Sequence, residues 1–112
     1  MAYDAIETPF GKTGKILGGC ATYIGLAASH FRTDCGLISI IGSDFESEYL
    51  DLLKSKKLDL EGVECIEGEK TFFWSGKYHN DLNTRTSLET QLNVLTKFKP
   101  KVPQKYKDAS FV

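Results

Sequence analysis

The sequence Gly18-Gly19-Cys20-Ala21-Thr22-Tyr23 leads directly into the apolar stretch 24–31, and a second apolar segment follows at 36–42. Paired glycines allow backbone angles, and a close approach of ligand to backbone, that a Cβ atom would block. The first turn of a helix has N–H groups without intrahelical partners, and these bind hydroxylated or anionic ligands. We therefore predict a ligand-facing glycine turn that opens a helix over residues 21–31.

The hydrophobic pattern around this turn predicts an α/β fold. The helix at 21–31 is apolar on nearly all sides, as expected for a helix packed closely against a sheet. Segment 36–42 is bounded by glycines and almost continuously apolar, which indicates a strand buried on both faces of a parallel sheet. Ser43 and Glu46 have the spacing of a capping box, which predicts a second helix over about 44–57.

The remaining segments have the patterns of strands. Residues 5–17 hold Pro9, Gly11 and Gly14 between short β-prone pieces, which predicts a hairpin-like ribbon. Residues 63–92 contain several β-prone segments around a polar turn, and we expect them to be antiparallel strands. Trp74 and its aromatic neighbours allow two interpretations, an ordinary packed sheet face or a cover over a bound ligand.

Composition narrows the class of protein. The chain has 112 residues, enough for one domain with a modest core. Its 14 Lys and Arg residues are balanced by 15 Asp and Glu, so no basic field favours nucleic acid as a partner. The three cysteines are widely spaced, which fits free thiols in a reducing cytoplasm. The longest apolar run is of strand length, far below the ~20 residues that span a bilayer, so we expect no membrane contact.

Motifs for other kinds of chemistry are incomplete. Gly11-Lys12-Thr13 lacks the glycine that a phosphate loop requires five positions earlier, where Ile6 stands. His30 and His79 have no second ligand at zinc spacing, and no serine or cysteine has the context of a catalytic nucleophile. A small regulatory α/β domain that binds a nucleotide at the glycine turn stays open as a weaker alternative.

The order of motifs resembles that of a known family. Asp4, then Gly18-Gly19-x-Ala21, an apolar helix, Ile41-Gly42-x-Asp44 and Gly62-Val63 resemble the N-terminal half of PfkB or ribokinase-family carbohydrate kinases. The resemblance covers nearly the whole chain. It implies a Rossmann-like parallel sheet, ribokinase-like but truncated, with a small antiparallel β lid from residues 5–17 and 70–92. Residues 1–112 are then expected to be a fragment, a single partial domain.

The resemblance also implies a substrate site at the glycine turn. Asp4 is expected to accept hydrogen bonds from sugar hydroxyls, which carboxylates do strongly, and Gly18 and Gly19 let the backbone approach the sugar. Cys20 and Tyr23 complete the implied substrate-binding set. The family usually has an asparagine where Tyr23 stands, so the identity of the sugar does not transfer to this chain.

The implied function is the substrate-binding portion of an ATP-dependent sugar or nucleoside kinase that phosphorylates a hydroxymethyl group. The family's D-T-x-G-A-G-D segment, which supplies the catalytic aspartate, is not in this sequence. We therefore assign no catalytic residue, and expect ATP and Mg²⁺ to bind the complete enzyme and not this chain alone. The alternative is a standalone interaction module without catalysis, in which β edges pair between chains. Both hypotheses are compatible with a homo-oligomer formed through the lid or exposed sheet edges.

Overall fold

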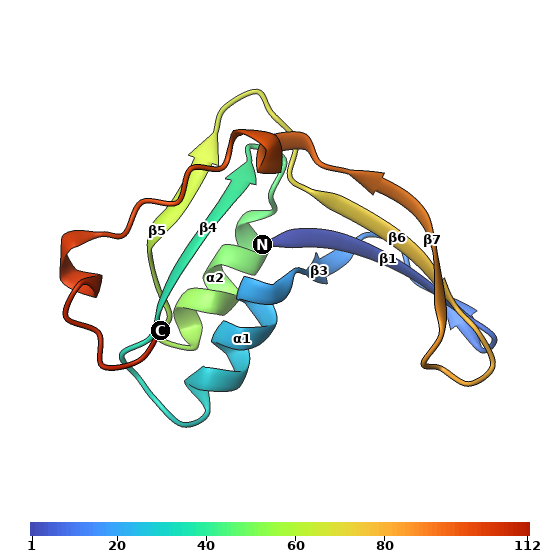
Figure 1. The fold of residues 1–112 in the computed structure, drawn as a ribbon, viewed down its shortest axis with the longest axis horizontal. Coiled ribbons are helices and arrows are strands. Elements are labelled where there is room, and N and C mark those ends of the chain that lie inside the picture. Colours follow the sequence, from blue (N-terminus) through green and yellow to red (C-terminus); the bar gives the residue numbers. More distant parts are fainter.

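The computed structural model describes residues 1–112 and divides them into a helical body and an arching sheet (Figure 1). In the body, β4 (Gly36–Gly42) and β5 (Asp59–Ile66) form a two-stranded parallel sheet. α1 (Cys20–Ser29) precedes β4, and α2 (Ser47–Ser55) connects β4 to β5. This βαβ unit is the parallel part of the predicted α/β fold.

None of the helices combines the length and the apolar character that crossing a membrane requires.

The second sheet, which we call the lid, arches away from the body (Figure 1). Its central strand β1 (Ala2–Thr8) pairs antiparallel with two short strands, β2 (Gly11–Lys12) and β3 (Ile16–Gly18). On its other edge β1 pairs in parallel with β6 (Phe73–Tyr78). β6 then pairs antiparallel with β7 (Arg85–Gln91), the outer strand. The predicted lid segments are therefore confirmed as strands of one sheet.

The direction of strand pairing differs from the expectation for residues 63–92. β5 runs parallel to β4, because helix α2 carries the chain back to the end of the sheet from which β4 started. β6 runs parallel to β1 because the whole body lies between them in the chain. Only β6 and β7, which a short turn joins, pair antiparallel as expected. The lid is thus a mixed sheet.

The predicted capping box is wrong. α2 begins at Ser47, and its N-cap residue Glu46 makes no side-chain cap. Ser43 Oγ instead accepts a hydrogen bond from the backbone N–H of Gly68, 3.0 Å away. Residues 43–46 form a turn because Ser43 is engaged by the loop after β5, so the helix starts later than the sequence pattern indicates.

Two apolar clusters hold the fold together. Leu37, Leu53 and Leu58 form a cluster inside the body, between the parallel strands and the helices. A second cluster contains Tyr3 and Phe73 of the lid together with Ile41 and Phe45 of the body. Each fully buried side chain of this kind contributes about 1.5–3 kcal/mol. The base of the lid is therefore fixed to the body by the same kind of packing that forms the core.

Helix α1 packs on the sheet through its small residues. A Cβ atom on Gly25 would lie 2.8 Å from Leu37 Cδ2, so the helix approaches β4 more closely than a larger residue would allow. Ile24 and Phe31 lie on the outside and are 66% and 87% exposed. The predicted helix is confirmed, but only one side of it is covered.

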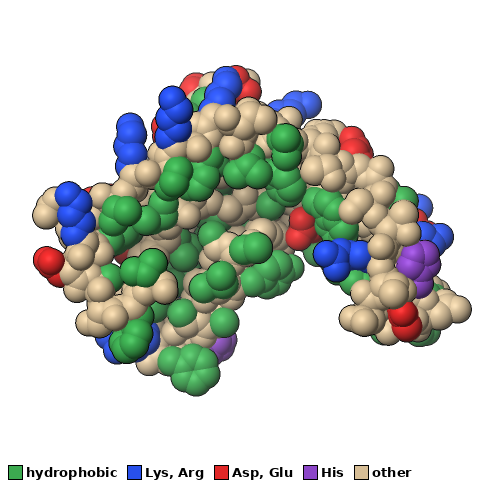
Figure 2. All heavy atoms as spheres, in the orientation of Figure 1, with side chains coloured by type: hydrophobic (Ala, Val, Ile, Leu, Met, Phe, Trp, Pro, Cys, Tyr) green, Lys and Arg blue, Asp and Glu red, His purple; other side chains and the backbone are tan.

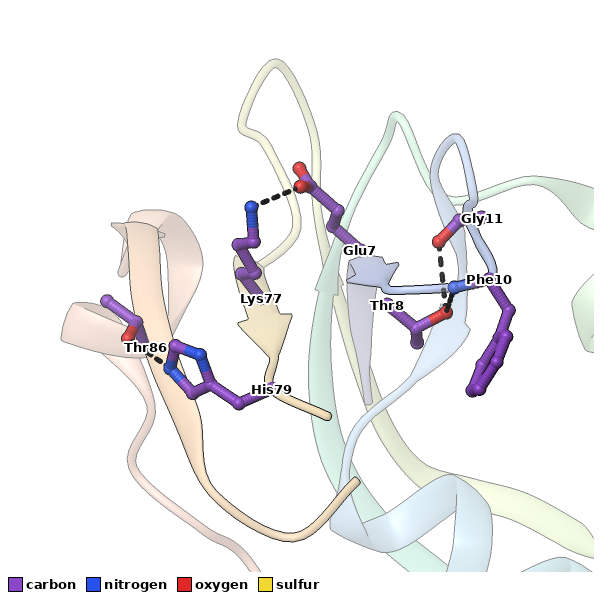
Figure 3. Close-up of polar contacts among 7 residues, drawn as sticks. All are labelled: Glu7, Thr8, Phe10, Gly11, Lys77, His79 and Thr86. Carbon is purple, nitrogen blue, oxygen red and sulfur yellow. Dashed lines mark hydrogen bonds and ion pairs between the residues drawn. The ribbon is translucent and has the colours of Figure 1, made fainter. Parts of the chain in front are cut away.

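The outer part of the lid is held by exposed polar contacts (Figure 3). Glu7 Oε1 of β1 forms an ion pair with Lys77 Nζ of β6 at 2.8 Å. His79 Nε2 and Thr86 Oγ1 form a hydrogen bond of 3.0 Å between β6 and β7. Both pairs join neighbouring strands, and both are open to solvent.

The turn between β1 and β2 is closed by a threonine (Figure 3). Thr8 Oγ1 accepts a hydrogen bond from the Phe10 N–H and donates one to the Gly11 carbonyl oxygen. The Phe10 ring points into solvent and is 84% exposed. This turn carries no apolar core of its own.

The C-terminal segment crosses the first residues of both parallel strands. A Cβ atom on Gly36 would lie 2.4 Å from Tyr106 Cζ, so the tyrosine ring occupies the space above that glycine. Tyr106 Oη donates a hydrogen bond to the Asp59 carbonyl oxygen, and Lys105 forms ion pairs with Asp59 and Glu61. Two short 3₁₀ helices, Asn93–Lys97 and Gln104–Tyr106, shape this segment.

Candidate functional site

The Asp4 carboxylate lies directly against the glycine turn. Asp4 pairs with Ile16 at the start of β3, and its carboxylate extends along the strand to Gly18 at the other end. A Cβ atom on Gly18 would lie 2.1 Å from Asp4 Oδ2, so only glycine leaves room for the carboxylate in this position. Burial raises the pKa of Asp4, and the backbone amide of Gly19 acts in the opposite direction. Asp4 is therefore a partly dehydrated hydrogen-bond acceptor at the start of α1.

Gly19 provides the conformation that starts the helix. It is the N-cap residue of α1 with φ 89° and ψ 146°, a backbone conformation that residues with a Cβ rarely adopt. A Cβ atom there would also lie 2.8 Å from the backbone nitrogen of Ala2. No side chain caps the helix, so its first-turn N–H groups remain available. The two glycines thus make room for the Asp4 carboxylate and for the first residues of the chain, and the close approach of a ligand to their backbone stays a prediction.

The structure separates the five expected site residues into two groups. Asp4, Gly18 and Gly19 are in mutual contact through the backbone and the carboxylate. Cys20 and Tyr23 lie in the first turn of α1. Both are exposed, and neither side chain makes a hydrogen bond. Neither side chain takes part in the contact between Asp4 and the glycine pair.

Strand pairing places an aromatic side chain beside Asp4 that sequence reasoning did not include in the site. Trp74 of β6 is the direct partner of Asp4 across β1 and β6. Side chains of directly paired residues lie on the same face of a sheet, whereas Tyr3 and Phe73 point to the opposite face and into the core. The signal that would identify Trp74 is the parallel register of β1 and β6, which the local sequence does not encode.

The surface is indented between the lid and the body. Figure 2 shows the surface indented between the arch of the lid and the helices, with hydrophobic side chains gathered on the body where it faces the indentation. No group of three or more His, Cys, Asp or Glu side chains is placed to hold a metal ion. The arrangement offers an acceptor for hydroxyls beside a helix start that no side chain caps.

The combination of a β lid, a glycine turn at a helix start and parallel strands is that of the ribokinase-like fold. The chain superposes on the nucleoside kinase of Burkholderia thailandensis in complex with inosine with a TM-score of 0.73. The two are 20% identical, and the match covers 86% of this chain and 35% of that one. The ribokinase of Cryptococcus neoformans var. grubii serotype A in complex with ADP matches with a TM-score of 0.66 and 16% identity, over 82% of this chain and 32% of that one.

Two kinases also match this chain in sequence. The cytidine kinase of Thermococcus kodakarensis is 31% identical over 110 residues, which is 97% of this chain and 38% of the relative. The nucleoside kinase of Methanothermobacter thermautotrophicus is 34% identical over 81 residues, 69% of this chain and 26% of the relative. No family model matches the chain. The predicted resemblance to PfkB or ribokinase-family kinases is confirmed, and the matches span only 38% and 26% of the lengths of these two relatives.

Proposed function

We propose that this chain is the substrate-binding portion of a kinase that transfers a phosphoryl group to a hydroxymethyl group of a sugar or nucleoside. The observation that carries the proposal is the Asp4 carboxylate seated on Gly18, at the uncapped start of α1. A carboxylate partly withdrawn from water forms strong hydrogen bonds with hydroxyl donors. The sugar hydroxyls are its natural partners, and Gly18 leaves the room that the carboxylate needs in this position.

The remaining proposed site residues surround this acceptor. Gly19 presents the N–H groups of the helix start to a ligand oxygen. Cys20 and Tyr23, both exposed on the first turn of α1, border the ligand on the helix side. The position of Tyr23 gives this chain a bulky aromatic side chain at the site entrance. The kinases named above as nucleoside and cytidine kinases favour a nucleoside among the candidate acceptors.

Phosphoryl transfer needs donors and metal ions around the transferred group, and a base near the attacking hydroxyl. We assign none of these roles to residues 1–112, which we propose to form a single partial domain. When bound by the complete enzyme, ATP and Mg²⁺ supply the phosphoryl group and neutralise its charge. The part played by this chain is to hold the acceptor and to place its hydroxyls.

The test is ligand binding by the chain and two matched variants. Isothermal titration calorimetry with cytidine, inosine, ribose and fructose measures affinity, and the single tryptophan reports the same titrations by fluorescence. Asp4→Asn removes the charge at the site, whereas Asp51→Asn removes one from the exposed side of α2. Hydrogen bonds to a charged group contribute about 1.5–3 kcal/mol, so Asp4→Asn should weaken binding roughly 10- to 100-fold. Asp51→Asn should leave it unchanged.

Two outcomes contradict the proposal. One is the absence of binding to every compound in the panel, measured at concentrations up to the millimolar range. The other is equal affinity of the Asp4→Asn and Asp51→Asn variants, which would show that the ligand does not use the carboxylate at the glycine turn.

We propose self-association through the lid as a second function, compatible with the first. The outer strand β7 has an unpaired edge, and Leu88 on it is 56% exposed. Sedimentation velocity should show a dimer that Leu88→Lys weakens. Val102→Lys, at a 51% exposed position on the C-terminal segment, is the matched control. A monomer at all concentrations contradicts this second proposal.

A further inference from the structure

The indole of Trp74 is held flat against the lid by its own sheet. A Cβ atom on Gly76 would lie 2.1 Å from Trp74 Cη2 and 2.3 Å from Cζ2, so the benzene ring covers that glycine. Trp74 Nε1 donates a hydrogen bond of 3.0 Å to Ser87 Oγ on β7. The ring is fixed at two points, by the glycine on its own strand and by the serine on the next strand.

The indole extends along the face of the lid that carries Asp4. Asp4 pairs with Trp74, and Ile6 pairs with Gly76. Two residues of a strand advance by about 6.6 Å, so the ring reaches from beside the carboxylate to beside Ile6. Trp74 is only half-buried, which leaves part of the ring accessible. The lid therefore presents a hydroxyl acceptor and a flat apolar surface next to each other.

Packing within the protein does not account for this arrangement. Trp74 belongs to neither apolar cluster, whereas its neighbour Phe73 lies in the cluster at the base of the lid. A glycine inside a strand weakens it and often marks a place where another group approaches closely. Gly76 has this position in β6, and the group that uses the space is the indole. Because residue 76 has no side chain, the indole of Trp74 lies over the strand in a fixed position and forms an aromatic platform.

We propose that Trp74 determines acceptor specificity by stacking against the base of a nucleoside while Asp4 accepts the hydroxyls of its sugar. This inference rests on the proposed function, because it concerns the same ligand. Every nucleobase has a π face that stacks on aromatic side chains. A platform already fixed by Gly76 and Ser87 loses little conformational freedom on binding. A free sugar reaches Asp4 but gains little from the indole.

The experiment compares cytidine with ribose, by calorimetry on the 112-residue chain. The chain should bind cytidine roughly 10- to 100-fold more tightly than ribose, the range that stacking of one base provides. Trp74→Ala should remove most of this difference by weakening cytidine alone, with less than about a twofold change for ribose. Trp74→Phe keeps an aromatic face and should restore at least half of the preference in logarithmic units.

Gly76→Ala provides a second test that keeps the indole in the protein. The new Cβ atom displaces the ring from its seat, and should reduce the preference for cytidine while shifting the tryptophan emission spectrum. Ser87→Ala removes the other anchor and should act in the same direction with a smaller effect. Circular dichroism confirms that each variant is folded, and the two anchor variants decide the question if Trp74→Ala does not fold.

The outcomes separate the two proposals. If the chain binds cytidine and ribose equally, or if Trp74→Ala weakens both to the same degree, the specificity role of Trp74 is overturned while the substrate site stands. If neither compound binds, the proposed function fails and this inference with it. A selective loss for cytidine supports both, because a merely structural role for Trp74 would not distinguish the two ligands.

Discussion

The body and the lid are stabilised by different physical means. In the body, Leu37, Leu53 and Leu58 are at most 6% exposed and pack between strands and helices. In the lid, all residues of β7 except the last are exposed, and the outer contacts are polar pairs in solvent. The body therefore supplies stability, whereas the lid supplies a surface whose shape is set by strand pairing. Substitutions in the two regions should therefore affect different measurements.

The largest expected effect is that of removing a core side chain from the body. Leu53 is completely buried, so Leu53→Ala loses transfer free energy and leaves a cavity. The free energy of unfolding should fall by about 2–5 kcal/mol. Urea unfolding followed by circular dichroism measures this change.

The matched control for that variant lies in the lid. Leu82→Ala shortens the same kind of side chain at a 52% exposed position of the turn between β6 and β7, and should change the free energy of unfolding by less than about 0.5 kcal/mol. If the two leucine variants were equally destabilised, the division between body and lid would be wrong.

The second effect is expected at the junction of the two regions. Thr71 is 1% exposed; its Oγ1 accepts a hydrogen bond from the Gly42 N–H and donates one to Asp44 Oδ1. Thr71→Val keeps the volume and leaves the Gly42 N–H buried without an acceptor, which should cost about 1–3 kcal/mol. Urea unfolding measures the loss. Thr71→Ser keeps both hydrogen bonds and should lose less stability than Thr71→Val, whereas a valine variant as stable as the parent would show that the hydroxyl does not matter.

The local sequence predicts the body better than the lid. The apolar run at 36–42 coincides with β4, and the glycine pair does open α1, because burial and helix starts leave local signals. The parallel pairing of β1 with β6 depends on where the intervening body places the two strands. The capping box at Ser43 failed because Gly68, distant in the sequence, competes for its hydroxyl.

Only part of the candidate site could be predicted from the sequence. The structure brings Asp4 and Gly18, two of the expected site residues, into contact, and their role in binding a substrate stays a prediction. The position of Trp74 beside Asp4 follows only from the register of two strands that are about 70 residues apart in the chain. Sequence alone left Trp74 between a packing role and a ligand role, since both have the same local pattern.

A smaller, pH-dependent effect on stability is expected for Asp4, which lies in the lid beside the start of α1. Burial raises the pKa of this carboxyl group in the folded state. A raised folded pKa contributes stability that is present below the unfolded pKa of about 3.9 and is lost as the pH rises through the folded pKa. Asp4→Asn should therefore be more stable than the parent chain at pH 7, with the gain vanishing towards pH 3.

The measurement for Asp4 is a series of urea unfolding curves between pH 3 and pH 8. Asp51→Asn is the control, and should not reproduce the pH-dependent gain. Together with the expected loss of ligand binding, a gain in stability would show that Asp4 is kept at the site for binding and at some cost to folding. A variant less stable than the parent at pH 7 would show that the carboxylate is satisfied within the chain.

The smallest effect is expected at the tip of the lid. Lys77→Gln breaks the ion pair with Glu7. The side chains of Lys77 and Glu7 are 50% and 38% exposed, and such exposed ion pairs add little stability because water and salt screen them. We expect no change in the urea midpoint beyond experimental error at physiological ionic strength. Glu7→Gln, which breaks the same pair from the other side, should behave alike. A loss comparable to that of Thr71→Val would mean that polar contacts, and not strand pairing, hold the outer lid in shape, and the orientation of Trp74 above Gly76 would then depend on the ion pair as well.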